Sequence, residues 1–204
     1  MLVDDHAIVR AGFRRLLEQQ GNFQVVAEAA DGESAYGQFC THQPDVVILD
    51  LSMPGVSGLS LVHRMIVRQP AARILVFSMH EDPTLAERAI QLGARGYVTK
   101  CSPPEVLVSA VEEMMSGRIA LSPDIAQALA LLKITGEGDP LASLSPREFE
   151  IFRMLARGQS IPAIAGLLSL SAKTVANYHS LIRQKLGIAS DVELVLLAQR
   201  RNVS

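Results

Sequence analysis

The fold is decided by the stretch Asp45-Val46-Val47-Ile48-Leu49-Asp50-Leu51-Ser52-Met53-Pro54-Gly55, in which an apolar run leads into an acidic residue and a turn. The continuous apolar, mostly β-branched run predicts a strand that is covered on both faces, as in a parallel sheet. Similar runs occur at residues 2–3, 24–27, 73–77 and 97–98. The segments between them have the amphipathic pattern of helices, at residues 7–19, 33–42, 58–68, 84–92 and 104–116. This alternation predicts a doubly wound, flavodoxin-like α/β domain with right-handed crossovers.

Length and composition narrow the class of protein. The chain has 204 residues, of which 49% are hydrophobic and 20% charged, as in a globular protein of one large or two small domains. The sequence contains neither an apolar run long enough to span a membrane nor the pattern of a signal peptide. Its two cysteines, Cys40 and Cys101, are too few for a disulfide framework or a cysteine-rich zinc site. We therefore expect a soluble cytoplasmic protein without a membrane partner.

The charge changes sign along the chain, although the net charge is only −2. Residues 1–140 carry 11 basic and 17 acidic residues, whereas residues 141–204 carry 8 basic and 4 acidic ones. The segment from Ile134 to Pro140 contains two glycines and a proline and has the composition of a linker. We predict an α/β domain over residues 1–116, a linker helix and flexible linker over residues 117–140, and an all-helical domain over residues 141–204.

The expected helical domain has the pattern of a helix-turn-helix protein. Ser145-Pro146-Arg147-Glu148 forms a capping box with proline at the first helical position. Its helices are predicted at residues 146–157, 161–168, 172–186 and 191–201, after an earlier helix from Ser122-Pro123 to about Lys133. The three residues 169–171 give the short turn after which a recognition helix enters the major groove.

One edge of the predicted sheet gathers polar side chains, because the carboxyl ends of parallel strands meet at one edge. The residues that follow the strands are Asp4 and Asp5, then Asp50, Ser78, Thr99 and Lys100. Crowded carboxylates favour a hard cation such as Mg²⁺, and a carboxylate can act as a nucleophile toward phosphorus. Each residue taken singly also has an ordinary explanation, such as a helix cap, a turn or a solvated lysine. The set at matching strand ends favours the phosphoryl-transfer site.

These residues resemble a known family. Leu2 to His6, Asp50 to Gly58, Ser78 and Gly96 to Lys100 resemble the receiver domain of two-component response regulators. The resemblance implies that a sensor histidine kinase phosphorylates Asp50, with Mg²⁺ held by Asp5 directly, by Asp4 mainly through water, by Asp50 and by the backbone carbonyl of Ser52. It further implies that Ser78 and Lys100 contact the phosphoryl group and that Tyr97 is an aromatic switch. The chain departs from the family by its few residues before Asp4 and by Cys101, where many relatives have proline.

The predicted recognition helix at residues 172–186 has one apolar and one polar face. Val175, Ile182 and Leu186 repeat at helical spacing, with Tyr178 or His179 between them, and form the expected inward stripe. On spacing alone, the polar face is equally well explained as a solvated surface and as a DNA-reading one. Candidate DNA contacts are Lys173, Asn177, Ser180 and Gln184, flanked by Arg183 and Lys185, with Thr174 near a phosphate.

Residues 141–204 resemble the LuxR-type output domain of the NarL/FixJ family, in particular its GacA/UvrY-like and UhpA-like branches. The resemblance implies base contacts around Ala176, Asn177 and Ser180. It also implies a dimerisation role for the last helix, through Val192, Val195 and Leu196; the alternative is that this apolar stripe packs entirely on its own domain. The expected function is a DNA-binding transcription regulator that is switched by phosphorylation and is no enzyme, with a kinase, double-stranded DNA and a second copy as partners.

Two other functions remain open at this point. A regulator of the same fold could work without phosphate, but the complete set of site residues favours phosphorylation. A Mg²⁺-dependent phosphatase would typically carry a second aspartate two residues after the first, where this chain has Ser52.

Overall fold

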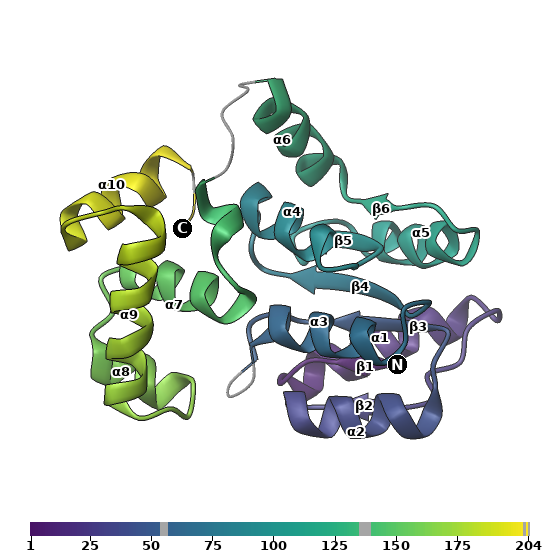
Figure 1. Ribbon diagram of the computed structural model, residues 1–204. Coiled ribbons are helices and arrows are strands. Elements are labelled where there is room, and N and C mark those ends of the chain that lie inside the picture. Colours follow the sequence, from purple (N-terminus) through teal and green to yellow (C-terminus); the bar gives the residue numbers. More distant parts are fainter. Residues whose placement is uncertain (54–56, 135–139, 202, 204) are drawn as a thin grey trace.

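The computed structural model describes residues 1–53, 57–134, 140–201 and 203 and contains a six-stranded parallel sheet (Figure 1). The strand order is β2-β1-β3-β4-β5-β6. The chain therefore adds β2 on one side of β1 and then crosses back to add β3 and all later strands on the other side. The strands are β1 (Leu2–Val3), β2 (Glu28–Ala29), β3 (Val46–Leu49), β4 (Arg73–Ser78), β5 (Gly96–Thr99) and β6 (Ala120–Leu121). The doubly wound α/β fold is thus confirmed.

Helices cover both faces of the sheet because the strand residues alternate between two apolar clusters. Val47 and Leu49 of β3 belong to the cluster that contains the inner faces of α2, α3 and α4, whereas Ile48 belongs to the cluster of α1 and α5. These helices are α1 (Ala7–Gln19), α2 (Gly32–His42), α3 (Gly58–Arg68), α4 (Pro83–Gln91) and α5 (Pro104–Met115). Their bounds agree with the predicted segments to within a residue.

The second strand lies later in the chain than predicted. Residues 24–27 are not a strand, and β2 begins at Glu28. The apolar character of this segment suits a strand, but β1 offers only Leu2 and Val3 as partners, and these pair with Glu28 and Ala29. The segment still touches β1 through Ala27, whose carbonyl accepts a hydrogen bond from the Leu2 N–H at 3.0 Å.

The sheet also extends beyond the predicted five strands. β6 adds to the far edge, with Gly96 opposite Ala120, and α6 (Pro123–Ile134) packs against α4 and β5. Residues 120–121 therefore belong to the sheet, and the predicted helix that follows them packs on the sheet half. Residues 135–139 of the expected linker lie outside the part of the chain that the structure describes.

The helical half of the chain consists of η1 (Pro140–Ser143), α7 (Pro146–Ala156), α8 (Ile161–Leu167), α9 (Ala172–Leu186) and α10 (Asp191–Arg200). A serine side chain caps the N-terminus of each of the four α-helices, and the predicted capping box of Ser145 and Glu148 is present. Its core includes Phe149 and Phe152 of α7 and Val175 and Ile182 of α9, all fully buried. The inward stripe expected for the recognition helix is thus confirmed.

The two halves touch through α7, which contacts α3 of the sheet half (Figure 1). Their apolar side chains form one continuous cluster that includes Leu61 and Leu85 of the sheet half and Phe149 and Phe152 of the helical half. No helix in the described ranges is long and apolar enough to cross a membrane.

Candidate functional site

The carboxyl ends of the strands bring two carboxylates and one ammonium together. Lys100 Nζ lies 2.5 Å from Asp4 Oδ2 and 2.6 Å from Asp50 Oδ2. All three side chains are largely buried. Burial opposes the charge of Lys100, but hydrogen bonds to Asp4 and Asp50 outweigh it and raise the pKa of the ammonium. The residues that the sequence places at separate strand ends therefore form one charged cluster.

Backbone pairing sets the positions of these side chains. The Asp50 N–H donates to the Val3 carbonyl at 2.8 Å, which aligns the ends of β3 and β1. The Lys100 N–H donates to the Ser78 carbonyl at 2.8 Å, which aligns the ends of β5 and β4. Because the site is built on paired strands, its geometry follows from the register of the sheet.

Both oxygens of the Asp50 carboxylate are engaged. Oδ2 accepts from Lys100, and Oδ1 accepts from the Ser52 N–H at 3.0 Å. The turn after Asp50 is held close by Gly58, where a Cβ would come within 2.5 Å of Leu51 Cα. The first turn of α3 therefore packs directly against Leu51, the residue that follows Asp50.

Asp5 lies beside this cluster with an unsatisfied oxygen. Its Oδ1 is buried and accepts no hydrogen bond of good geometry, although His6 Nδ1 lies 2.9 Å away. Ligand atoms of Asp4, Asp5 and His6 all lie within 4.8 Å of one another. Asp4 also accepts from the His6 N–H at 2.8 Å, so it has a local structural role beside its place in the cluster. Oxygen donors of this kind fit a hard cation such as Mg²⁺.

Ser78 and Tyr97, the two expected switch residues, are both fully buried. Ser78 Oγ accepts a hydrogen bond from the His80 N–H at 3.2 Å. The Tyr97 hydroxyl donates to the His80 carbonyl at 2.8 Å, and burial raises the pKa of this phenol well above its usual value. The tyrosine ring is therefore turned inward, under the loop that follows Ser78.

The loop from Ser78 to Asp82 contains two residues that sequence reasoning missed. His80 joins Tyr97 to the acidic side of the site, since its Nε2 lies 3.3 Å from Ser52 Oγ. Burial, together with the charges of Arg153 and Arg157, lowers the pKa of His80 to about 4. Asp82 caps α4 by accepting from the Thr84 N–H at 2.9 Å. The pattern Asp82-Pro83 is the available signal, because aspartate before proline is typical of a helix start.

Some candidate DNA-contacting side chains of α9 are exposed, and others already bind a partner within this chain. Lys173, Asn177, Ser180 and Gln184 are exposed. Lys185 is exposed as well, but its Nζ lies 2.6 Å from Glu148 Oε2, and the half-buried Arg183 donates from its guanidinium to the Ala189 carbonyl. Thr174 and Ala176 are half-buried. Thr174 Oγ1 lies 2.8 Å from Ser171 Oγ, and the Ala176 carbonyl accepts a hydrogen bond from Ser180 Oγ.

The apolar stripe of α10 is only partly used within the chain. Leu194 and Ala198 are buried, Val195 is half-buried, and Val192 and Leu196 are 68% and 46% exposed. The alternative that the whole stripe packs on its own domain therefore does not hold in this structure.

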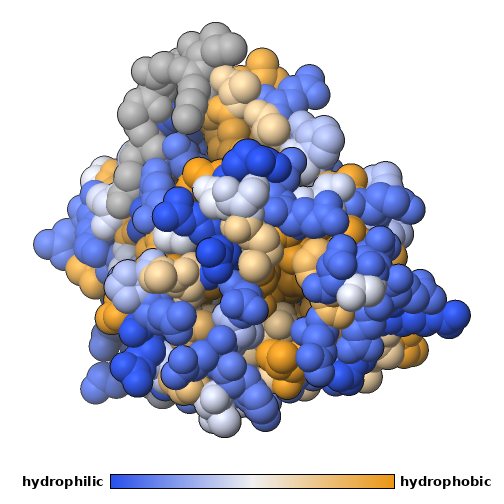
Figure 2. All heavy atoms as spheres, turned by 90° about the vertical axis from the view of Figure 1, so that its right-hand side faces the viewer, coloured by the Kyte–Doolittle hydropathy of each residue, from blue (hydrophilic) through white to orange (hydrophobic). Residues whose placement is uncertain are grey.

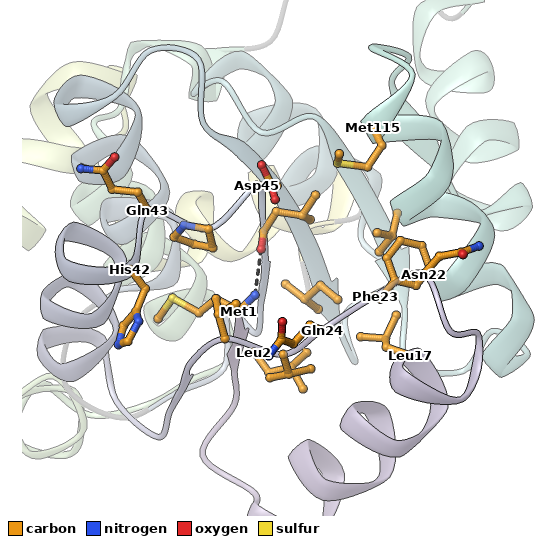
Figure 3. A pocket seen from close by; sticks show the side chains of 16 residues that line it. Met1, Leu2, Leu17, Asn22, Phe23, Gln24, His42, Gln43, Asp45 and Met115 are labelled. Atoms are coloured by element: carbon orange, nitrogen blue, oxygen red, sulfur yellow. Dashed lines mark hydrogen bonds between the residues drawn. The ribbon is translucent and has the colours of Figure 1, made fainter.

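A pocket lies at the opposite end of the sheet and holds the start of the chain (Figure 3). It has a volume of about 370 Å³ and is bordered by Met1, Phe23 and Asp45 among others. The Met1 ammonium donates to the Val46 carbonyl at 2.9 Å. Figure 2 shows apolar side chains gathered near the centre of the face turned toward the viewer, between hydrophilic ones. The pocket is remote from the carboxylates of the candidate site.

Comparison with known proteins agrees with this architecture. Residues 1–112 match the response regulator receiver domain, and residues 142–198 match the luxR family of bacterial regulatory proteins. The chain is 40% identical over 205 residues to the response regulator UvrY of Escherichia coli K12, covering all of this chain and 94% of that protein. It therefore belongs to the response regulators, with a receiver domain and a luxR-type helix-turn-helix domain, and such proteins are transcription regulators rather than enzymes.

Solved structures give the same result. A LuxR-family response regulator from Aurantimonas sp. SI85-9A1 is 48% identical over 66% of this chain and 96% of its own, with a TM-score of 0.64. RcsB from Salmonella enterica serovar Typhimurium, bound to promoter P1flhDC in the presence of the phosphomimetic BeF₃⁻, is 30% identical, with a TM-score of 0.70 over 98% of this chain and 96% of its own. Another structure shows two RcsB dimers bound to two parallel DNAs, at 29% identity and a TM-score of 0.64 over 97% of this chain and 96% of that one.

Proposed function

We propose that this chain is a cytoplasmic transcription regulator whose DNA binding is switched by Mg²⁺-dependent phosphorylation of Asp50. The observation that carries the proposal is the Lys100 ammonium, which lies between Asp4 and Asp50. A buried cation beside a nucleophilic carboxylate suits a reaction that brings further negative charge to the same place. A sensor histidine kinase is the expected donor.

Asp4, Asp5, Asp50 and the backbone carbonyl of Ser52 would hold the Mg²⁺. The unsatisfied Oδ1 of Asp5 supports this fit, because a buried carboxylate oxygen without a hydrogen bond gains from a cation. When bound, the ion supplies neutralisation of charge on the transferring phosphoryl group.

The reaction of Asp50 is a phosphoryl transfer. A carboxylate oxygen of Asp50 forms a bond to phosphorus while the bond from phosphorus to the imidazole nitrogen of the kinase breaks. Lys100 is placed to neutralise the negative charge of the phosphoryl group, since its ammonium already contacts Asp50. A rotation of the Ser78 side chain toward a phosphoryl oxygen would draw its Oγ away from the His80 N–H. Phosphorylation is therefore expected to loosen the loop above Tyr97.

DNA binding is assigned to the exposed face of α9. Asn177 can read adenine through two hydrogen bonds, and Lys173 supplies charge toward a phosphate. Thr174, Ala176 and Ser180 border this face, and Arg183 and Lys185 reach DNA only by leaving their present partners. The exposed Val192 and Leu196, with Val195 beside them, suit a second copy of the chain, so that a dimer would read two half-sites.

The test is DNA affinity at fixed salt, with random duplexes as the first target pool. The wild-type protein and an Asp50→Asn control are incubated with Mg²⁺ and acetyl phosphate, and the enriched sequences define the half-site. We expect the donor to raise specific binding in the wild type alone. Equal binding with and without donor, in both proteins, would leave a DNA-binding protein that is not controlled through Asp50.

A further inference from the structure

A side chain of the helical half reaches the loop that links the phosphorylation site to the Tyr97 ring. Arg153 of α7 places its Nε 4.0 Å from Asp82 Oδ2. The two side chains are 11% and 2% exposed, so the contact is shielded from solvent. Since Asp82 caps α4, the arginine contacts the point where the β4–α4 loop becomes a helix.

This loop joins three functional groups within five residues. At its start, Ser78 is the expected phosphoryl contact. In its middle, the two backbone groups of His80 bond to Ser78 Oγ and to the Tyr97 hydroxyl. At its end stands Asp82, which faces Arg153. A movement at either end can therefore be transmitted through a short segment that hydrogen bonds hold at His80 and at Asp82.

Further contacts hold the two halves together around the same loop. Thr84 Oγ1 donates to the Arg201 carbonyl at 3.1 Å, which ties α4 to the end of α10. Ser57 at the start of α3 lies within hydrogen-bonding reach of the Glu150 carboxylate on α7. The positive charge of Arg153 also acts on both His80 and Tyr97, so the guanidinium lies close to the switch itself.

We propose that Arg153 is a positioning residue of the phosphorylation switch: from the DNA-binding half, it holds the loop of residues 78–82 over a buried Tyr97 and thereby slows phosphorylation of Asp50. The inference rests on the proposed function. Coupling between two sites is reciprocal, so phosphorylation that draws Ser78 away from His80 weakens the contact of Arg153 with Asp82 and releases α7. The exposed face of α9 is not covered by this docking, so the contact controls how the halves are arranged rather than access to the recognition helix.

The test measures phosphoryl uptake by the full-length chain from acetyl phosphate and Mg²⁺, followed by intact mass. We expect Arg153→Met and Asp82→Asn each to raise the uptake rate several-fold above that of the wild type. Asparagine is also a good helix cap, so the second variant keeps the start of α4 intact. The double variant should match the single ones, because either change alone breaks the contact. Arg153→Lys, which keeps the charge, should stay closer to the wild type.

The matched controls are Arg200→Met and Glu112→Gln, which remove the same charges from exposed positions in the same two halves. Amide hydrogen exchange gives a second readout, and residues 79–82 should exchange faster in Arg153→Met than in Arg200→Met. Wild-type uptake with unchanged Arg153→Met and Asp82→Asn rates would overturn this inference and leave the proposed function standing. Additive effects in the double variant would also overturn it. A wild type that takes up no phosphoryl group on Asp50 would overturn the proposed function and, with it, this role of Arg153.

Discussion

A protein that starts at Met1 is expected to show an unusual dependence of stability on pH. Met1 is only 7% exposed, and its ammonium has the Val46 carbonyl as a partner. Burial lowers the pKa of this ammonium from 8.0 to about 6, although the charge of Asp45 partly opposes the shift. Between these two values the unfolded chain binds more protons than the folded one, so stability rises with pH.

The size of the effect follows from the shift. A difference of two pKa units corresponds to about 3 kcal/mol, as a ceiling, lost from the free energy of unfolding when the pH falls from above 8 to below 6. Adding two uncharged residues before Met1 converts the ammonium into a peptide N–H, which can still donate to Val46. The extended protein should lose this pH dependence while keeping the hydrogen bond.

The measurement is urea unfolding of both proteins at a series of pH values from about 5.5 to 8.5, analysed by linear extrapolation. The extension also adds backbone that can pair with neighbouring strands, and this shifts stability equally at every pH. The difference between the two curves therefore isolates the terminus, because all other titrating groups are shared. Curves that run parallel across this range would refute the reasoning.

Three further predictions concern charge and packing. Lys100→Met should destabilise the protein by about 2 kcal/mol in the absence of metal, because it leaves Asp4 and Asp50 without their cation, and millimolar Mg²⁺ should recover much of the loss in thermal melting. Gly58→Ala should cost about 1–3 kcal/mol in chemical unfolding, because the added Cβ would overlap Leu51 Cα. Lys185→Met should lower the free energy of unfolding of the helical half above pH 4.5. Burial raises the pKa of Glu148, but the hydrogen bonds from Lys185 and Ser145 outweigh burial and lower this pKa. The stability that these bonds add is therefore present above the ordinary pKa of 4.5 and is lost on acidification.

Each of these has a control within the chain. Arg68→Met removes an exposed cation at the end of α3 and should leave the response to Mg²⁺ unchanged. Gly37→Ala places a methyl group where no atom lies within 4 Å, in the middle of α2, and should stabilise rather than destabilise. For Lys185→Met, the variant and the wild type should converge at low pH; a constant difference down to pH 3 would contradict the role given to Glu148.

The order of most elements could be predicted because most of them have a strong local signal. The apolar run before Asp50 and the capping box of Ser145 and Glu148 are local signals that the structure confirms. The strand expected at residues 24–27 failed for a non-local reason, since a strand exists only where a partner strand pairs with it. β6 consists of Ala120 and Leu121 alone, which carry no periodicity, so its pairing with β5 could not be seen in advance.

The candidate site shows the same division. Its acidic residues could be predicted because parallel strands end at one edge, whatever the details of packing. The inward ring of Tyr97 could not, because it depends on a hydrogen bond to a carbonyl in a different loop. The sequence around Arg153 did not indicate its contact with Asp82, because this contact forms only where the sheet half and the helical half pack against each other.

The exposed face of α9 bears on how the regulator finds its targets. A basic half that is free to touch phosphates binds any duplex weakly and can slide along it, and this binding weakens as salt rises. The unphosphorylated pool would then already be distributed along the chromosome before a signal arrives. Phosphorylation would act on molecules that are searching, by lengthening their stay at a correct operator through pairing, rather than by sending them from solution to DNA.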